Sequence, residues 1–212
     1  MTLRLFAGIP VAGPARAALE SALGRWRHQF PAVRWVDAAD LHITLQFIGA
    51  WEEADEPELI AALTNVIPPR IELAVSGLDA FPSLRRPRIV IAGVAAAPEL
   101  TALAAGVNRA LAPLGIVPEP RPYRPHITLA RLRAPAPLPS LVGAGPSAAS
   151  PSPHPFSSSP AVRAPQGLEP HEPQPGLRGV EVVPTWGDCP VDSFNLYQTL
   201  AGHYRIRRRF PR

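Results

Sequence analysis

The sequence predicts a duplicated α+β fold in which two similar units face each other across a central cleft. Two observations predict it. The tetrapeptide His-Ile-Thr-Leu occurs twice, at residues 42–45 and 126–129. Each copy ends a similar run of predicted elements, since His42 follows Leu3 by 39 positions and His126 follows Ile89 by 37. Two strand–helix–strand–strand units of nearly equal length indicate pseudo-two-fold symmetry, which brings equivalent strands side by side.

The first unit begins with an apolar strand that Pro10 and Gly13 end. Pro14 then starts an amphipathic helix, in which apolar residues recur at helical spacing. An acidic turn leads from the last strand of the unit to another helix. The predicted ranges are 3–9 (strand), 14–30 (helix), 33–36 and 41–48 (strands) and 52–58 (turn). We expect the helix after the turn to bury Leu59, Ile60, Leu63 and Ile67 before Pro68-Pro69 stops it.

The second unit repeats this order after a linking strand at 71–78. Its first strand, 88–94, resembles the opening strand of the chain. A second amphipathic helix runs through 100–114, and Gly115 ends it. The strand that carries His126 follows.

The stretch 134–179 differs from both units. It is rich in Pro, Ser, Ala and Gly and has no apolar period, so we expect a disordered insert with exposed, inert His154 and His171. The sequence thus divides into 1–133, the duplicated catalytic core, 134–179, the insert, and 180–212, C-terminal strands that complete the domain. These strands are expected at 191–197 and 204–210, and the second carries an arginine cluster that is either an RNA contact or a solvated edge: Arg205, Arg207, Arg208 and Arg209.

Composition excludes several classes of protein. The chain has 212 residues, 46% of them hydrophobic, and no apolar run long enough to span a bilayer. Its single cysteine, Cys189, rules out an internal disulfide and is expected to be a small buried side chain. The net charge is +4, with arginine as the only basic residue type besides histidine, which permits a polyanionic partner. We expect a cytoplasmic monomer.

The repeated tetrapeptide suits acid–base chemistry. Successive strand side chains point to opposite faces, so His42 shares a face with Thr44, and His126 shares one with Thr128. One neutral imidazole would deprotonate water, and one charged imidazole would protonate a departing oxygen. The two threonines would bind the oxygens of a phosphoryl group between them.

Arg131 is a candidate for a charge-assisted bond to the same oxygens. In strict alternation, however, it falls on the face opposite His126. A twist, a bulge or a strand end must therefore turn it toward the histidines.

Metal binding is the competing use of paired histidines. Asp40 precedes His42 by two residues and gives an Asp-x-His pair, but the second copy has Arg124 at the equivalent place. A cation there argues against a symmetric metal site. We therefore interpret Asp40 as a turn or strand-start residue and expect no metal.

With these motifs in hand, the chain resembles the 2H phosphoesterase superfamily, and within it the bacterial and archaeal RNA 2′,3′-cyclic phosphodiesterases, also called 2′-5′ RNA ligases. The resemblance covers nearly the whole chain outside the insert. It rests on the segments 4–10, 33–36, 41–49, 81–83, 86–88, 125–131, 191–197 and 202–204.

The resemblance implies a bilobal fold with antiparallel sheets that line the cleft and helices outside. It implies hydrolysis of a terminal 2′,3′-cyclic phosphate of RNA, including tRNA fragments, to a 2′-phosphomonoester without metal or cofactor. By this analogy His42 is the acid, His126 the base and Arg131 a phosphate contact. Two alternatives stay open: 2′-5′ RNA ligation, the reverse reaction, and an RNA-binding module that has lost catalysis.

Overall fold

The computed structural model describes residues 1–83, 86–133 and 184–212. The predicted insert, with His154 and His171, lies outside these ranges. The strands are β1 (Thr2–Pro10), β2 (Arg34–Trp35), β3 (His42–Glu52), β4 (Ile71–Phe81), β5 (Ile89–Val94), β6 (His126–Arg131), β7 (Thr185–Val191), β8 (Ser193–Leu200) and β9 (His203–Pro211). The helices are α1 (Gly13–Gln29), α2 (Glu56–Thr64) and α3 (Pro98–Leu111).

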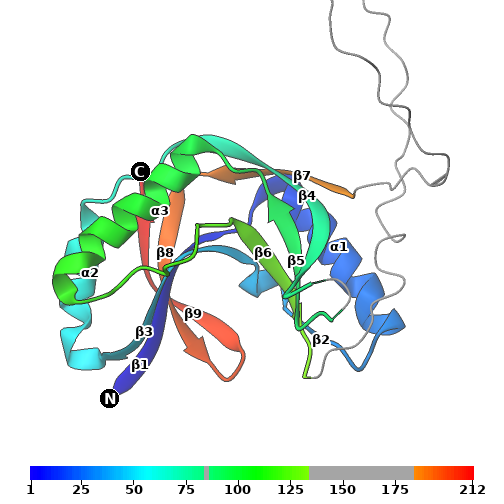
Figure 1. The fold of residues 1–212 in the computed structure, drawn as a ribbon, viewed down its shortest axis with the longest axis horizontal. Coiled ribbons are helices and arrows are strands. Elements are labelled where there is room, and N and C mark those ends of the chain that lie inside the picture. The colour runs from blue at the N-terminus through cyan, green and yellow to red at the C-terminus, as the bar shows by residue number, and fades with distance from the viewer. Residues whose placement is uncertain (84–85, 134–183) are drawn as a thin grey trace, which may run out of the picture.

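The described strands form one nine-stranded sheet in the order β7-β4-β5-β6-β3-β1-β8-β9, with β2 against β6. Every registered pair is antiparallel. The sheet curls like an open half-barrel, with α2 and α3 at one end and α1 at the other (Figure 1). The expected α+β class is therefore confirmed, and the strands of the two halves join in a single sheet.

The duplication is visible in the strand order. β3 and β6 lie side by side at the centre, flanked by β1 and β8 on one side and by β5 and β4 on the other. The two central strands pair at Ile43 and Ile127, the equivalent residues of the two tetrapeptides. The pseudo-two-fold axis therefore passes between these two strands.

One apolar core lies between the helices and the sheet. Helix α1 contributes the side chains that recur on one face: Ala15, Leu19, Ala22, Leu23 and Trp26. Trp26 stacks on Trp35 at 5.3 Å and meets Trp186 edge to face at 5.9 Å. We call the side of the sheet that carries Ile43 the core face, and the opposite side, which carries His42, the site face.

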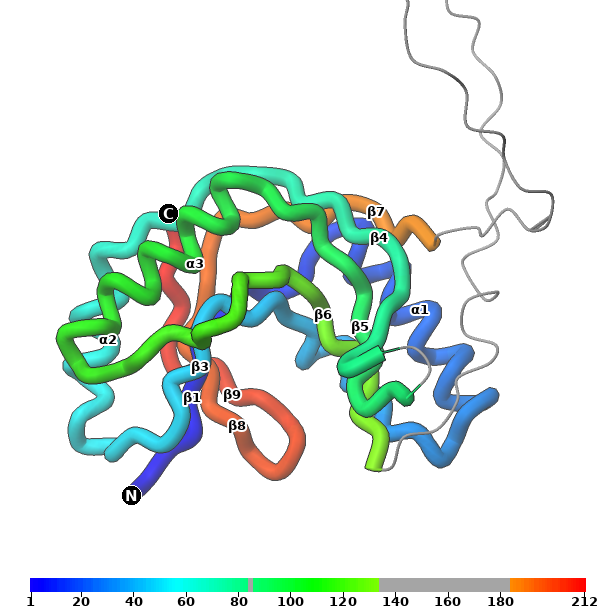
Figure 2. Tube along the Cα trace, in the orientation of Figure 1, coloured from blue at the N-terminus to red at the C-terminus, as the bar shows by residue number. Residues whose placement is uncertain are grey.

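Two expectations about element ends are wrong. Helix α2 ends at Thr64, so Ile67 falls beyond it and is 74% exposed instead of buried. The strand expected at 191–197 is divided at Asp192, because β7 pairs with β4 whereas β8 pairs with β1. The chain crosses there from one half of the sheet to the other, and the β8–β9 hairpin that follows continues the sheet beyond β1 (Figure 2).

Cys189 is free and buried, as expected, and burial raises the pKa of its thiol. Within residues 1–83, 86–133 and 184–212, no helix is both long enough and apolar enough to cross a bilayer.

Candidate active site

The two histidines lie diagonally across the central strand pair. Ile43 is opposite Ile127 on the core face. Continuing this antiparallel register puts His42 opposite Thr128 and Thr44 opposite His126, all on the site face. Diagonal neighbours in such a pair have Cα atoms roughly 7–8 Å apart, a spacing at which two imidazoles can contact one phosphoryl group.

Each imidazole is oriented by a backbone carbonyl two residues earlier. The Nδ1 atom of His42 lies 2.7 Å from the Asp40 carbonyl, and that of His126 lies 2.8 Å from the Arg124 carbonyl. Because a carbonyl oxygen can only accept, each Nδ1 carries the hydrogen and donates it. The Nε2 atom of each ring is therefore the one that takes up or releases a proton, as acid–base work by either ring requires.

The environment of both rings favours the neutral imidazole. The pKa of His42 is lowered from 6.5 to about 4, chiefly by burial and also by the charge of Arg131 and the nearby His126, which together outweigh the bond to the Asp40 carbonyl. Burial also lowers the pKa of His126, helped by the charges of Arg124 and Arg131. A bound anion between the rings would raise both pKa values.

A bulge brings Arg131 to the site face. On β6, Thr128 pairs with Ile91 and Ala130 with Val90, so Leu129 has no partner on β5. Leu129 and Ala130 are both fully buried, and Arg131 is exposed. Two consecutive residues thus take the core face, and the alternation shifts by one. This bulge turns Arg131 to the face of His126, which strict alternation would not do. It brings the Arg131 charge close to both histidines.

The first copy of the motif contains the same bulge. On β3, Thr44 pairs with Gly8 and Gln46 with Ala7, which leaves Leu45 without a partner on β1. The residue that the shift turns to the site face is Phe47, which pairs with Phe6. Phe47 is therefore the structural equivalent of Arg131, five residues after its histidine.

The model of the 2′-5′ RNA ligase superfamily matches residues 14–153. This chain belongs to that superfamily. The superfamily assignment agrees with the resemblance that the paired motifs indicate.

Two curated relatives are named RNA 2′,3′-cyclic phosphodiesterase. The Aeropyrum pernix protein is 37% identical over 116 residues, 54% of this chain and 66% of that relative. The Aquifex aeolicus protein is 36% identical over 105 residues, 48% of this chain and 56% of that relative. The matches therefore span less than two thirds of these relatives. A crystal structure of a Thermus thermophilus protein shares the fold, with a TM-score of 0.68, 24% identity and coverage of 99% of this chain and 97% of that one.

Aromatic rings surround the first histidine of this superfamily member. The ring of His42 lies 4.7 Å from Phe6, 4.8 Å from Tyr204 and 5.8 Å from Tyr197. Gly8 lets β1 pass close to β3 beside this ring, because a Cβ there would lie 3.0 Å from the Ile43 carbonyl oxygen. These neighbours could not be predicted from the sequence, because Phe6, Tyr197 and Tyr204 are far from His42 along the chain.

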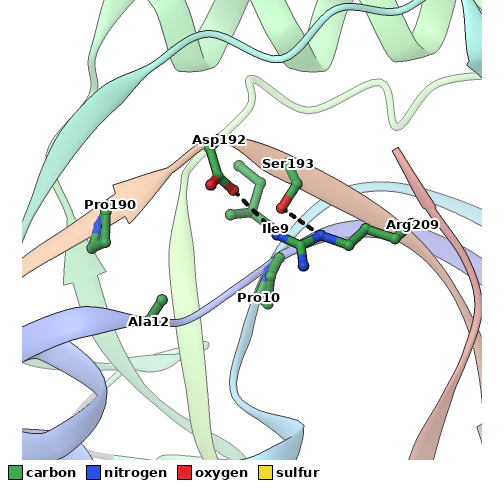
Figure 3. Close-up of a pocket in the computed structure, with 7 residues that line it drawn as sticks. All are labelled: Ile9, Pro10, Ala12, Pro190, Asp192, Ser193 and Arg209. Carbon is green, nitrogen blue, oxygen red and sulfur yellow. Dashed lines mark hydrogen bonds and ion pairs between the residues drawn. The ribbon is translucent and has the colours of Figure 1, made fainter. Parts of the chain in front are cut away.

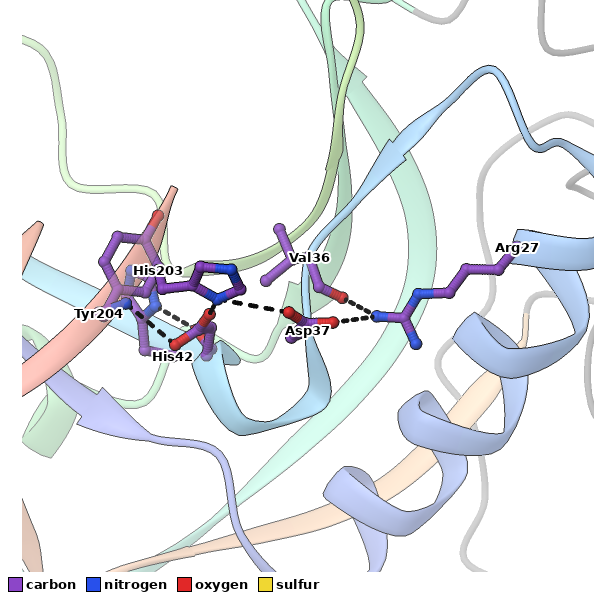
Figure 4. Close-up of polar contacts among 7 residues, drawn as sticks. Arg27, Val36, Asp37, His42, His203 and Tyr204 are labelled. Atoms are coloured by element: carbon purple, nitrogen blue, oxygen red, sulfur yellow. Dashed lines mark hydrogen bonds and ion pairs between the residues drawn. The ribbon is translucent and has the colours of Figure 1, made fainter. Parts of the chain in front are cut away.

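Asp40 connects the β8–β9 hairpin to the segment before β3. Its buried carboxylate accepts hydrogen bonds from the Tyr204 backbone N–H at 3.1 Å and His203 Nδ1 at 3.0 Å. His203 also lies 3.4 Å from Asp37 (Figure 4). In the described part of the chain, Asp37, Asp40 and His203 are the group whose side chains are close enough to share a cation, and it contains neither paired histidine.

The second histidine has a different surrounding. The Phe81 ring meets the His126 ring edge to face at 5.2 Å. The Arg124 guanidinium lies 5.2 Å from the centre of the Phe81 ring. Arg124 also forms an ion pair with Asp79. The Tyr123 hydroxyl donates to the Thr44 carbonyl at 3.0 Å, which connects the segment before β6 to β3. Only Tyr123 and Arg124 lie close to His126 along the chain, so no sequence signal indicated the contacts of Phe81 and Asp79.

Two of the four arginines in the C-terminal cluster, Arg207 and Arg209, have structural partners. Arg207, on β9, forms ion pairs with Glu56 and Glu53 near the start of α2. Arg209 contacts Ser193 and Asp192 beside a pocket of about 170 Å³ (Figure 3). The residues that line this pocket include neither the paired histidines and threonines nor Arg131. The interpretation of Arg207 as a solvated edge or RNA contact is thus replaced by a structural ion pair.

Proposed function

We propose that this chain hydrolyses the terminal 2′,3′-cyclic phosphate of RNA to a 2′-phosphomonoester. The observation that carries the proposal is the pair of imidazoles on one sheet face, each with Nδ1 fixed by a carbonyl and Nε2 left for proton transfer. Membership of the superfamily and the activity named for the curated relatives support the same reaction.

In the proposed mechanism, His126 removes a proton from water, which attacks phosphorus in line. His42 protonates the departing 3′ oxygen. The hydroxyls of Thr44 and Thr128 donate to the non-bridging oxygens, and the Arg131 guanidinium neutralises their charge. Because the pKa of His42 is about 4 without ligand, its proton is retained mainly when the phosphate anion is bound.

The proposed reaction needs no metal or cofactor. All the groups that it uses are side chains of β3 and β6, and proton transfer by the two imidazoles accounts for both the attack and the departure. The monomeric state and the cytoplasmic compartment stay predictions from the sequence.

The first experiment is product analysis on adenosine 2′,3′-cyclic phosphate in excess EDTA. We expect adenosine 2′-phosphate as product and an undiminished rate with the chelator. His42→Ala and His126→Ala should each lower kcat by roughly 10²- to 10⁴-fold. His28→Ala, at an exposed position of α1, is the matched control. Near-normal rates in both site variants, with circular dichroism unchanged, would refute the acid–base assignment.

A second experiment separates the two roles. In a phosphodiester with a p-nitrophenyl leaving group, the p-nitrophenolate departs without a proton. Hydrolysis of this ester therefore needs the base but not the acid. We expect His42→Ala to retain most of the wild-type rate on this ester and His126→Ala to lose it. The opposite result would exchange the roles of the two residues.

The superfamily description also favours 2′-5′ RNA ligation, which is the reverse reaction and uses the same groups. Incubation with tRNA half-molecules and analysis of the joined product tests it. Tight binding of adenosine 2′-phosphate without turnover of any cyclic substrate would instead indicate a binding module.

A further inference from the structure

Four residues form a row across the site face beside His42. Phe47 on β3 is paired with Phe6 on β1, Phe6 with Tyr197 on β8, and Tyr197 with Ile206 on β9. Directly paired residues share a face, so the row is continuous. We call Phe47, Phe6, Tyr197 and Ile206 the apolar row.

The apolar row is buried in the middle and exposed at its ends. Phe6 and Tyr197 are 3% and 7% exposed, whereas Phe47 is 63% exposed and Ile206 54%. The ring of Phe47 lies 6.2 Å from that of Phe6, which in turn lies 4.7 Å from His42. An exposed aromatic ring supported by buried rings is a surface on which a flat apolar ligand can stack.

The pseudo-symmetry shows where the two halves differ. Phe47 and Arg131 follow equivalent bulges at equivalent positions, yet one presents an aromatic ring and the other a cation. A symmetric pair of imidazoles cannot by itself orient a substrate. Because β3 carries an aromatic ring where β6 carries a cation, the two halves of the site differ chemically.

The in-line reaction restricts where the nucleoside lies. Water attacks phosphorus from one side, and the 3′ oxygen leaves from the other. Because that oxygen stays attached to the ribose, the nucleoside lies on the side of the acid. Phe6, Tyr197 and Ile206 lie on the strands beyond β3, on the side away from β6 and His126. The row touches His42 through Phe6, whose ring lies 4.7 Å from the imidazole.

We propose that the apolar row, with Phe47 as its exposed ring, stacks the terminal nucleobase and thereby holds the ribose beside His42. The proposal rests on the proposed function. Phe47 lies three residues beyond Thr44 along β3, roughly 10 Å, which a nucleoside can span between phosphate and base. Every base has a flat face, so the row accepts all four bases.

The test compares two substrates: adenosine 2′,3′-cyclic phosphate and methyl riboside 2′,3′-cyclic phosphate, which lacks a base. Stacking of one base on an aromatic side chain corresponds to roughly 5- to 150-fold in affinity. We expect Phe47→Ala to raise KM for the adenosine substrate by a factor in this range and to leave both constants for the base-free substrate unchanged. Phe47→Trp should restore the adenosine KM, and Phe47→Leu should not.

Ile67→Ala is the matched control, because Ile67 is an equally exposed apolar residue outside the sheet. Calorimetric binding of adenosine 2′-phosphate, set against inorganic phosphate, repeats the comparison without turnover. Equal losses on both substrates, or no loss on either, would overturn the apolar row as the base site. Wild-type protein that turns over neither substrate would instead refute the proposed function.

Discussion

His42 is a titratable side chain that the fold removes from water. It is 8% exposed, its Nδ1 donates to the Asp40 carbonyl, and the rings of Phe6 and Tyr204 pack against it. Burial of a histidine favours the neutral form, which lowers its pKa. The same burial that holds the ring in place therefore makes the protonated form depend on a bound anion.

This burial predicts a pH-dependent contribution to stability. The folded pKa of His42 is about 4 and its ordinary value is 6.5, so the unfolded chain binds the proton more readily. Stability should fall as pH drops from 6.5 toward 4 and then level off, by about 3 kcal/mol from this residue. Urea unfolding of wild type and His42→Gln at the two ends of this range measures it.

We expect the loss between the two pH values to be smaller in His42→Gln. His28→Gln, at an exposed helix position, should leave it unchanged. Parallel curves of unfolding free energy against pH for wild type and His42→Gln would contradict the account. They would show that His42 binds a proton equally well in the folded and the unfolded chain.

Strand irregularities decide which side chains reach the site. The paired bulges at Leu45 and Leu129 each turn one later residue, Phe47 and Arg131, to the site face. On the neighbouring strand β1, Gly8 allows the backbone to pass close to the Ile43 carbonyl. Position within the site thus depends on a few backbone features of β1, β3 and β6.

Gly8→Ala tests the close approach of β1 to β3. A Cβ would meet the Ile43 carbonyl at 3.0 Å, so β1 and β3 must shift apart by a few tenths of an ångström next to His42. We expect a loss of about 1–3 kcal/mol in unfolding free energy and a lower kcat. Thermal unfolding and steady-state kinetics measure the two effects.

Gly24→Ala is the contrasting control. Nothing lies within 4 Å of a Cβ at Gly24, in the interior of α1, so this change should stabilise the chain by about 0.5–1 kcal/mol. A Gly8→Ala variant as stable and active as wild type would show that the two strands adjust without effect on His42.

At the scale of the whole molecule, the site exists because two halves meet. β3 and β6 come from different units and are registered at one pair, Ile43 and Ile127. The far end of the sheet is anchored separately, by the Arg207–Glu56 ion pair between β9 and α2. Each half supplies one imidazole, so the two rings come together only when the halves pack.

The pair predicts two bell-shaped pH profiles that do not coincide. In the free protein both imidazole pKa values lie below 6.5, so kcat/KM should be maximal below that pH. The bound phosphate anion raises both pKa values, so the kcat profile should lie at higher pH. Steady-state rates across the acid and neutral range measure both. A kcat profile at the same or lower pH would contradict the electrostatic account.

Sequence reasoning could propose the candidate site because its signal was local. Two identical tetrapeptides at matching places identified His42, Thr44, His126 and Thr128, and alternation gave their shared face. Sequence reasoning could not decide which face of the sheet Arg131 takes, because a bulge depends on pairing with a neighbouring strand. It misplaced Ile67 because an apolar period does not show where a helix ends.

By itself, the sequence determined the elements, the duplication and the residues that can exchange protons, because hydrophobic period and motif spacing are written along the chain. Only the tertiary structure decided which strands adjoin, that Phe47 and Arg131 occupy equivalent places, and that Phe6, Tyr197 and Tyr204 surround His42. Those relations join residues far apart in the chain, and strand pairing fixes them through hydrogen bonds and packing that no local pattern records.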